Sequence, residues 1–344
     1  MAPDERPAVN DKIGLFITPP VPGVRHFPVD YDQAARTLQG CARTVWVLET
    51  WLDIERSDGK YDWSSLDKRV EIAVKNGFDV GIRAQVVLCG NGPKMERVTI
   101  SRAPAFVDGD MASDDFKNKA ARFYQALAQR YAGKARYIAV GNSVNSYFDL
   151  NPKQWEGFKK AYPAIVRAIH QAAPKVVVMS DLEYGEEFFE DKGKLQKYLD
   201  FFGASEDDAF GFIFYFISKV YYGDFANFNA RRLSEVLDEM RERTRGKKVY
   251  LIETSCFSKN PINGTDMSEV QGRYADMLIR AVVEREYIIG LSWWQLYDAD
   301  DAPDVPWDFK AGFGLFDSAG KPKPAWTTWR RLCTLKKVTQ TDRS

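Results

Sequence analysis

The sequence predicts a single-domain (β/α)8 TIM barrel, a closed cylinder of parallel strands surrounded by helices. Short apolar segments rich in β-branched and aromatic residues recur eight times, and helical segments separate most of them. This alternation indicates a parallel sheet. No Gly-x-Gly-x-x-Gly turn follows any strand, which favours a closed barrel over an open doubly wound sheet. A chain of 344 residues is long enough for one such barrel with extended loops.

The expected strands are mostly apolar throughout, which is typical of parallel strands that are covered on both faces. They span residues 13–17, 44–48, 79–83, 137–140, 175–179, 210–215, 248–252 and 288–292. We therefore expect the barrel to occupy residues 13–332, with terminal tails at 1–12 and 333–344.

The segments between the strands have apolar residues at spacings of three and four, the pattern of amphipathic helices. The expected helices are 65–76, 114–132, 153–172, 192–202, 229–245 and 268–285. Gly77, Gly133 and Gly246 stand where three of them stop, so we expect these glycines to be left-handed caps. Residues 89–115 and 299–316 are predicted to be long loops at the end of the barrel where enzymes of this fold build their sites.

Composition argues against several classes of function. The 48 Lys and Arg balance the 48 Asp and Glu, so there is no net charge to attract nucleic acid or an anionic membrane. No apolar stretch reaches the roughly 18 residues of a membrane span. With two histidines and four scattered cysteines, we expect no metal site and no cofactor. The first residues lack the features of a signal peptide, which leaves both the cytoplasm and secretion with a removed signal open.

The residues at the expected C-terminal strand ends are mainly acidic and aromatic. They are Glu49, Asn142, Ser143, Asp181, Glu183, Tyr215, Glu253, Trp293, Trp294 and Asp298. In a barrel these positions meet at one mouth. Aromatic faces stack on sugar rings, and carboxylates attack or protonate a glycosidic centre. The combination predicts an oligosaccharide or glycoside as the partner.

Three regions resemble the clan A glycoside hydrolases, and the resemblance covers roughly residues 13–332. Residues 51–67 contain acidic residues before a Gly-Lys-Tyr-Asp-Trp turn, and residues 312–325 are similar to the clan's ending after strand eight. The most specific match joins Val-Gly-Asn-Ser-Val-Asn at 140–145 with Tyr-Leu-Ile-Glu-Thr at 250–254. The resemblance implies a retaining glycosidase, with an Asn-Glu pair after strand four that includes the acid/base and a nucleophilic Glu after strand seven.

The resemblance also implies roles for single residues. Glu253 matches the nucleophile, although a salt-bridged rim carboxylate is the alternative reading. Other matches are the asparagine that binds the sugar 2-hydroxyl, the tryptophan under the cleaved sugar, the tyrosine that touches the nucleophile and an arginine near it: Asn142, Trp294, Tyr215 and Arg43. Tyr215 alternatively packs in the core. Further candidates, from strand three and the fourth loop, are Arg83 as an ionic partner of Glu253, and Asn145 and Tyr147 as ligand contacts.

The chain departs from the clan at Ser143, where the acid/base glutamate is expected. A serine hydroxyl has no proton that dissociates near neutral pH, and loss of a positioned acid/base typically costs about 10² to 10⁴ in rate. Three explanations are open. The first is an engineered Glu→Ser replacement that traps bound sugar, and the second is a natural carbohydrate-binding barrel without catalysis. The third covers a proton donor relocated to Glu183, Glu49 or Asp181, or a different chemistry altogether. The segment 141–145 lacks the second glycine of a nucleophile elbow, which argues against acyl transfer.

Overall fold

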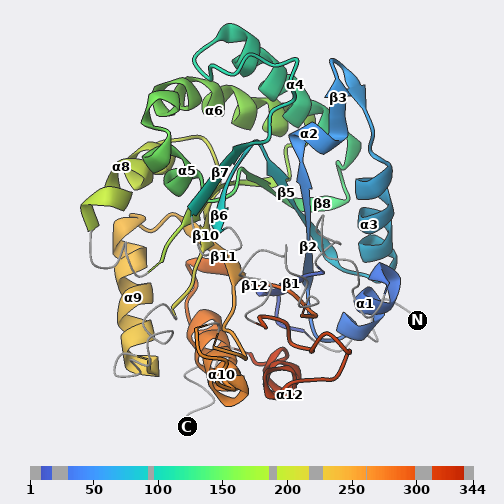
Figure 1. Ribbon diagram of the computed structural model, residues 1–344, viewed down its shortest axis with the longest axis vertical. Coiled ribbons are helices and arrows are strands. Elements are labelled where there is room, and N and C mark those ends of the chain that lie inside the picture. Colours follow the sequence, from blue (N-terminus) through green and yellow to red (C-terminus); the bar gives the residue numbers. More distant parts are fainter. Residues whose placement is uncertain are drawn as a thin grey trace.

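The computed structural model describes residues 9–17, 30–91, 97–185, 192–216, 228–260, 262–298 and 312–336. Eight parallel strands close into a barrel in the order β1-β12-β11-β10-β9-β8-β5-β2, which confirms the predicted (β/α)8 class. Figure 1 shows these strands at the centre with helices around them. The expected terminal tails lie mostly outside the described residues.

Several strands are longer than the sequence predicted. The barrel strands are β1 (Ile13–Phe16), β2 (Thr44–Thr50), β5 (Asp79–Gln85), β8 (Ala135–Val140), β9 (Val177–Glu183), β10 (Ala209–Ile213), β11 (Lys248–Thr254) and β12 (Ile288–Trp293). β2, β5, β9 and β11 run past their expected C-terminal ends. Glu49, Asp181, Glu183 and Glu253 therefore lie within strands rather than after them, and the alternation of each strand decides which way they point.

The helices that surround the barrel are α1 (Tyr31–Leu38), α3 (Ser64–Lys75), α4 (Asp114–Arg130), α6 (Pro152–Ala172), α8 (Lys192–Gly203), α9 (Ala230–Arg243), α10 (Ser268–Val283) and α12 (Pro324–Leu332). The six predicted helices correspond to α3, α4, α6, α8, α9 and α10. Gly77, Gly133 and Gly246 have left-handed φ angles of 82°, 77° and 77°. Gly77 directly follows the C-cap Asn76 and confirms the expected cap, whereas Gly133 and Gly246 lie two residues after the C-caps Tyr131 and Thr244. Within the described residues, no helix is both long and apolar enough to cross a membrane.

Two short helices and two hairpins lie outside the expected pattern. Helices α2 (Trp51–Ile54) and α5 (Val144–Leu150) follow β2 and β8, and strands β3 (Glu55–Ser57) and β4 (Lys60–Tyr61) form an antiparallel pair. The predicted long loop at 89–115 contains another pair, β6 (Val87–Asn91) and β7 (Arg97–Ser101). The second expected loop, 299–316, lies largely outside the described residues.

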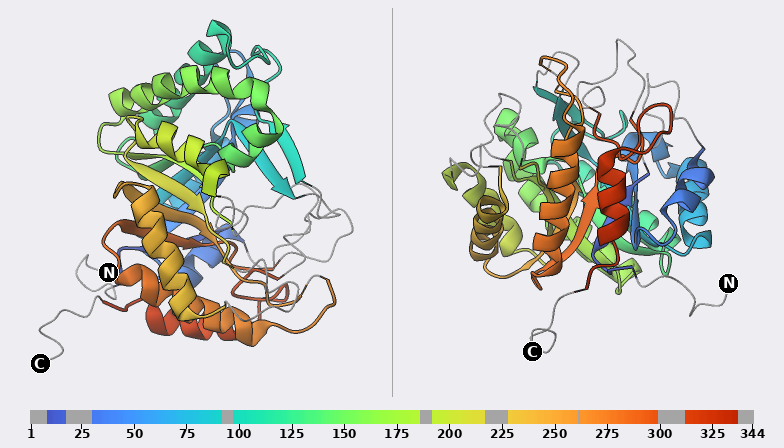
Figure 2. Two further views of the ribbon diagram at one scale, coloured as in Figure 1. Left: turned by 90° about the vertical axis from the view of Figure 1, so that its left-hand side faces the viewer. Right: turned by 90° about the horizontal axis from the view of Figure 1, so that it is seen from below.

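The β6–β7 hairpin marks the end of the barrel where the site residues converge. In the left view of Figure 2 it projects, in cyan, on the side to which the orange and red segments after β11 and β12 also extend. All of these segments follow the C-terminal ends of barrel strands. This end of the barrel is therefore the mouth, as in other barrels of this class.

Aromatic side chains fill the barrel below the mouth. The rings of Trp46 from β2, Tyr137 from β8 and Tyr250 from β11 pack together. The Trp46 centroid lies 6.0 Å from that of Tyr137 and 5.3 Å from that of Tyr250, and the two tyrosine centroids are 5.1 Å apart. Their rings need glycines opposite them. A Cβ atom on Gly81 would lie 2.4 Å from Trp46, and one on Gly290 would lie 2.1 Å from Tyr250. This packed layer closes the barrel, so the polar residues further along the strands form the floor of the mouth.

Candidate active site

At the centre of the mouth, one arginine joins two carboxylates. Arg83 on β5 is fully buried. Its Nε and Nη2 atoms donate to the two oxygens of Asp181 on β9, with an Nη2–Oδ1 distance of 3.0 Å, and its Nη1 atom donates to Oε2 of Glu253 on β11. The guanidinium carbon lies 5.8 Å from the ring centroid of Phe16 on β1. Three separate strands thus contribute to one charged cluster.

The strand geometry explains why Arg83 and Glu253 face each other. Gly81 faces the Trp46 ring inside the barrel, and Arg83, two residues later, points to the same side. On β11, Tyr250 pairs with Gly211 and Glu253 with Ile213, so β11 advances three residues while β10 advances two. This β-bulge turns both Tyr250 and Glu253 inward.

Each oxygen of the Glu253 carboxylate has a donor. Arg83 contacts Oε2, and the Tyr215 hydroxyl donates to Oε1 at 2.8 Å. The Glu253 side chain is 12% exposed, so it reaches the surface of the mouth. The Tyr215 ring also packs against Phe313, with centroids 5.8 Å apart. The structure thus brings together Glu253 and two of the residues that the sequence suggested as its partners.

Burial changes the titration of the cluster. It raises the pKa of Asp181 to about 6, although the charge and hydrogen bonds of Arg83 oppose this rise. Burial lowers the pKa of Arg83, but the two carboxylates more than compensate and hold that pKa above its ordinary value. Arg83 therefore stays positively charged, and Asp181 can lose its charge in mildly acidic solution.

Ser143 lies on the other side of the same cluster. Its backbone N–H donates to Oδ1 of Asp181 at 3.4 Å, and the residue is 4% exposed. Its φ angle of 50° is left-handed, which is uncommon for a residue with a side chain. Ser143, at the end of β8, and Glu253, on β11, thus both contact the Arg83–Asp181 pair. The two positions that the sequence pairs as acid/base and nucleophile are therefore linked through Asp181 and Arg83.

Two neighbours of Ser143 have different surroundings. Asn145 is fully buried, accepts a hydrogen bond from the Glu183 N–H at 2.7 Å and donates to the Glu183 carbonyl at 3.0 Å. It fastens α5 to the end of β9, and this arrangement does not support its predicted role as a ligand contact. Asn142 and Tyr147 are mostly buried beside the mouth and stay candidates for sugar contacts.

Glu183, at the end of β9, is already engaged. It forms an ion pair with Arg97 of the β6–β7 hairpin, and the Ser146 hydroxyl donates to its Oε2 atom at 2.7 Å. This contact ties the hairpin to the rim of the barrel. A role for Glu183 as a relocated proton donor would require it to break these contacts.

Glu49 points away from the mouth, which does not support its predicted role as a site residue. It forms an ion pair with Arg69 of α3, a helix that packs on the outside of the barrel. Glu49 lies three residues after Trp46, which faces inward, so strand alternation turns it outward. Burial raises the pKa of Glu49 against the effect of Arg69. It is not available as a relocated acid.

Arg43 lies at the opposite end of the barrel from Glu253, which corrects its predicted position near the nucleophile. It directly precedes β2, and its Nε atom contacts Asp79, the first residue of β5, at 3.0 Å. Residues at the start of parallel strands share the N-terminal end of the barrel. The arginine beside Glu253 is Arg83 instead.

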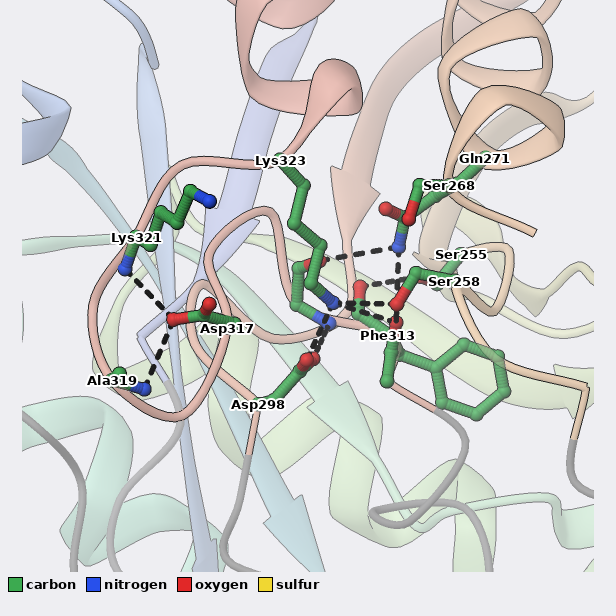
Figure 3. A network of polar contacts seen from close by, with 12 residues as sticks. Ser255, Ser258, Ser268, Gln271, Asp298, Phe313, Asp317, Ala319, Lys321 and Lys323 are labelled. Carbon is green, nitrogen blue, oxygen red and sulfur yellow. Dashed lines mark hydrogen bonds and ion pairs between the residues drawn. The ribbon is translucent and has the colours of Figure 1, made fainter. Parts of the chain in front are cut away.

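Asp298 belongs to a structural network rather than to the charged cluster (Figure 3). The Lys323 ammonium contacts its Oδ2 atom at 2.5 Å, and the Gly314 N–H donates to its Oδ1 atom at 2.8 Å. Lys323 also donates to the Ser258 hydroxyl at 2.8 Å and to the Gly312 carbonyl at 3.0 Å. Burial raises the pKa of Asp298, against Lys323. This network holds the segment after β12 to the barrel, so the expected sugar contact at Asp298 is not supported.

The adjacent tryptophans of β12 point in opposite directions, as expected. Trp293 is fully buried between Tyr274 of α10 and Trp329 of α12. Trp294 is 9% exposed and meets the Phe16 ring edge to face, with centroids 5.1 Å apart. Because Phe16 also contacts Arg83, Trp294 lies beside the charged cluster.

Sequence reasoning missed the role of Asp181. Asp181 was a candidate acid, but the structure makes it the buried partner of Arg83. The sequence could have revealed this role if the fifth strand had been extended to Glu183, because the alternation of side chains then turns Asp181 into the barrel. Among the described residues, no group of three His, Cys, Asp or Glu side chains is arranged to hold a metal ion.

The comparisons with known proteins agree on the fold. A scan against protein-family models gives no match, and neither does a search of curated proteins. A family 39 glycoside hydrolase from the gut symbiont Bacteroides cellulosilyticus WH2 is similar in structure, with a TM-score of 0.68, 16% identity and 96% of this chain aligned to 64% of that one. GH5_18 from Streptomyces cattleya in complex with GlcNAc has a TM-score of 0.69 at 16% identity, over 94% of this chain and 80% of that chain.

The exo-β-1,4-mannosidase Op5Man5 from Opitutaceae bacterium strain TAV5 is also similar, with a TM-score of 0.67 and 17% identity over 97% of this chain. The match spans 62% of that mannosidase. At such identities the likeness establishes the barrel fold, and the chemistry has to be argued from the site.

Proposed function

We propose that this chain is a glycoside hydrolase of the retaining type with Glu253 as its nucleophile. The observation that carries the proposal is the Glu253 carboxylate at the mouth, with Arg83 on one oxygen and Tyr215 on the other. The two donors fix the direction of the carboxylate, as attack on a sugar carbon requires. The names of the structural neighbours support the same class of reaction.

In the proposed mechanism, Glu253 attacks the anomeric carbon and forms a covalent glycosyl-enzyme while the leaving oxygen departs. Trp294 supports the sugar ring from the side of Phe16. Ser143 supplies no proton to the leaving group, and it does not activate the water that would release the sugar. The first step therefore proceeds with leaving groups that are stable as anions, and the covalent intermediate accumulates.

We propose β-mannosides as the first substrates to test. One structural neighbour is named an exo-β-1,4-mannosidase, and another GH5_18 structure holds Manβ1-4GlcNAc. The Trp294 ring beside the charged cluster offers an aromatic face for the apolar side of a sugar ring.

Ser143→Glu tests the assignment of the acid/base position. With 4-nitrophenyl β-mannoside, we expect the variant to turn over at least about 100-fold faster than the unchanged protein, since a general acid/base typically contributes about 10² to 10⁴ in rate. Ser143→Gln is the matched control, because glutamine has the same shape and no acid. Equal rates for the two variants would contradict the assignment.

A carbohydrate-binding barrel without turnover is the second candidate, and Ser143 is the observation that favours it. The two functions differ with 2,4-dinitrophenyl β-mannoside, whose leaving group needs no proton. The proposed hydrolase releases a burst of dinitrophenol, and azide, which needs no general base, accelerates the steady state. A pure binding protein releases none.

A further inference from the structure

We propose that Asp181 is the positioning residue that couples the two catalytic positions, orienting Arg83 toward Glu253 on one side and holding the backbone of residue 143 on the other. The inference rests on the proposed function of Glu253. It assigns a role to a buried carboxylate that never touches substrate, because the Asp181 side chain has no exposed surface.

The first argument is geometric. A guanidinium group is planar, and Asp181 accepts from two of its nitrogens, Nε and Nη2. Two bonds to one carboxylate fix the plane of the Arg83 group and its rotation within that plane. The remaining nitrogen, Nη1, then points at Oε2 of Glu253. Without Asp181, Arg83 would keep one anchor and could turn about it.

The second argument concerns charge. The ionised Asp181 offsets the positive potential of Arg83 at the Glu253 oxygens, so their electrons stay more available for attack on carbon. With a neutral residue at 181, the whole charge of Arg83 would act on Glu253. A cation so placed stabilises the carboxylate and makes it a weaker nucleophile.

The third argument concerns the other catalytic position. Oδ1 of Asp181 accepts the Ser143 N–H at 3.4 Å, at a residue whose φ angle of 50° is unfavourable for a side chain. The same oxygen accepts from Arg83. One carboxylate oxygen therefore links the peptide that carries residue 143 to the guanidinium that orients Glu253.

The groups that face Asp181 define its pH response. They are Arg83 from β5, Glu253 from β11, the Ser143 N–H from the end of β8 and, at longer range, Tyr124 from α4. Burial raises the pKa of Asp181 to about 6. Below that pH the carboxylate is neutral and Arg83 acts on Glu253 alone. We therefore expect the rate of the first chemical step to rise as pH increases through about 6.

Asp207 is a matched control on the same barrel. Its side chain has no exposed surface, contacts the Lys247 ammonium at 2.7 Å and accepts from the Tyr162 hydroxyl at 2.9 Å. Burial raises its pKa as well. Asp207 precedes β10 and so lies at the end of the barrel away from the mouth. Asp207 also accepts from the backbone N–H of Ser180, the residue before Asp181, at 3.3 Å. Within the described residues its carboxylate forms no hydrogen bond or ion pair with Arg83, Asp181 or Glu253, so Asp207→Asn removes a buried charge from outside the charged cluster.

The test is the pre-steady-state burst with 2,4-dinitrophenyl β-mannoside between pH 5 and 8. At pH 7.5 we expect Asp181→Asn to slow the burst rate constant at least about tenfold, with the burst amplitude and KM nearly unchanged, and to remove the rise near pH 6. We expect Asp207→Asn to stay within about twofold and to keep the rise. Asp181→Glu, which retains the charge, should retain the rise with a reduced rate.

Circular dichroism shows whether each variant is folded. If folded Asp181→Asn gives the burst rate and pH profile of the unchanged protein, the inference is wrong while the proposed function stands. If the unchanged protein gives no burst with any dinitrophenyl β-glycoside, the proposed function itself fails. If neither Asp181 variant folds, the pH profile of the unchanged protein decides. A burst rate constant that rises near pH 6 supports the inference, and one that stays flat from pH 5 to 7 contradicts it.

Discussion

At the scale of single residues, the hydrogen-bond and ion-pair partners of each carboxylate show whether it belongs to the charged cluster at the mouth. Glu253 receives one donor per oxygen, whereas Glu49 and Asp298 are bound to Arg69 and Lys323 outside the charged cluster. Hydrogen bonds to charged groups contribute about 1.5 to 3 kcal/mol, so the two donors to Glu253 hold its carboxylate in one orientation.

Tyr215→Phe removes one of those donors and leaves the ring that packs on Phe313. We expect the burst rate constant with 2,4-dinitrophenyl β-mannoside to fall at least about tenfold, because the Glu253 carboxylate loses a donor that fixes its direction toward the anomeric carbon. Tyr198→Phe is the control, because its hydroxyl donates to Asp149 at the same 2.8 Å but on the outer helix α8. Equal effects of the two changes would show that Tyr215 acts only on stability.

Part of this site could be predicted from the sequence. Glu253, Tyr215 and Arg83 were all named as neighbours, because clan resemblance and strand order place them at one mouth. Arg43 and Glu49 were misplaced for simple physical reasons. Arg43 precedes its strand and so lies at the other end of the barrel. Glu49 is one of the alternate residues of β2 whose side chains point out toward the helices. Pairing between side chains on different strands depends on the tilt and stagger of the closed barrel, which no local pattern encodes.

At the scale of secondary-structure elements, the helices that were predicted are those with one apolar face. Helix α5 was missed because five of its residues in a row, Val144 to Phe148, are buried, so its sequence has no amphipathic pattern. The β6–β7 hairpin was predicted to be a loop because Gly92 and Pro93 interrupt it, although Val98, Thr99 and Ile100 favour a strand.

The barrel strands depend on glycines that face aromatic rings. Gly290→Ala would place a Cβ atom 2.1 Å from a ring carbon of Tyr250, in a packed interior that has no space to accept it. Overpacking of this kind costs about 1 to 3 kcal/mol, so we expect a clear loss of stability in urea unfolding. Gly109→Ala is the control, since a Cβ atom there meets no atom within 4 Å. Equal midpoints for the two variants would contradict the described packing.

At the scale of the whole molecule, closure of the sheet produces the site. Arg83 and Glu253 are 170 positions apart in the chain, and Arg83 and Asp181 are 98 apart, yet the three form one cluster. The alternation of strands and helices predicted this convergence, because all parallel strands end at one mouth. The sequence did not predict that Asp181, rather than the glutamate expected at position 143, would complete the cluster.

The central claim is that Glu253 forms a covalent bond to the sugar. The direct test is incubation with 2,4-dinitrophenyl 2-deoxy-2-fluoro-β-mannoside, and with its gluco and galacto counterparts, followed by mass spectrometry of the intact protein and its peptides. We expect a mass gain of one fluorosugar on the peptide that contains Glu253, and none in Glu253→Gln. A fluorosugar on a different carboxylate, or no adduct with all three probes, would contradict the claim.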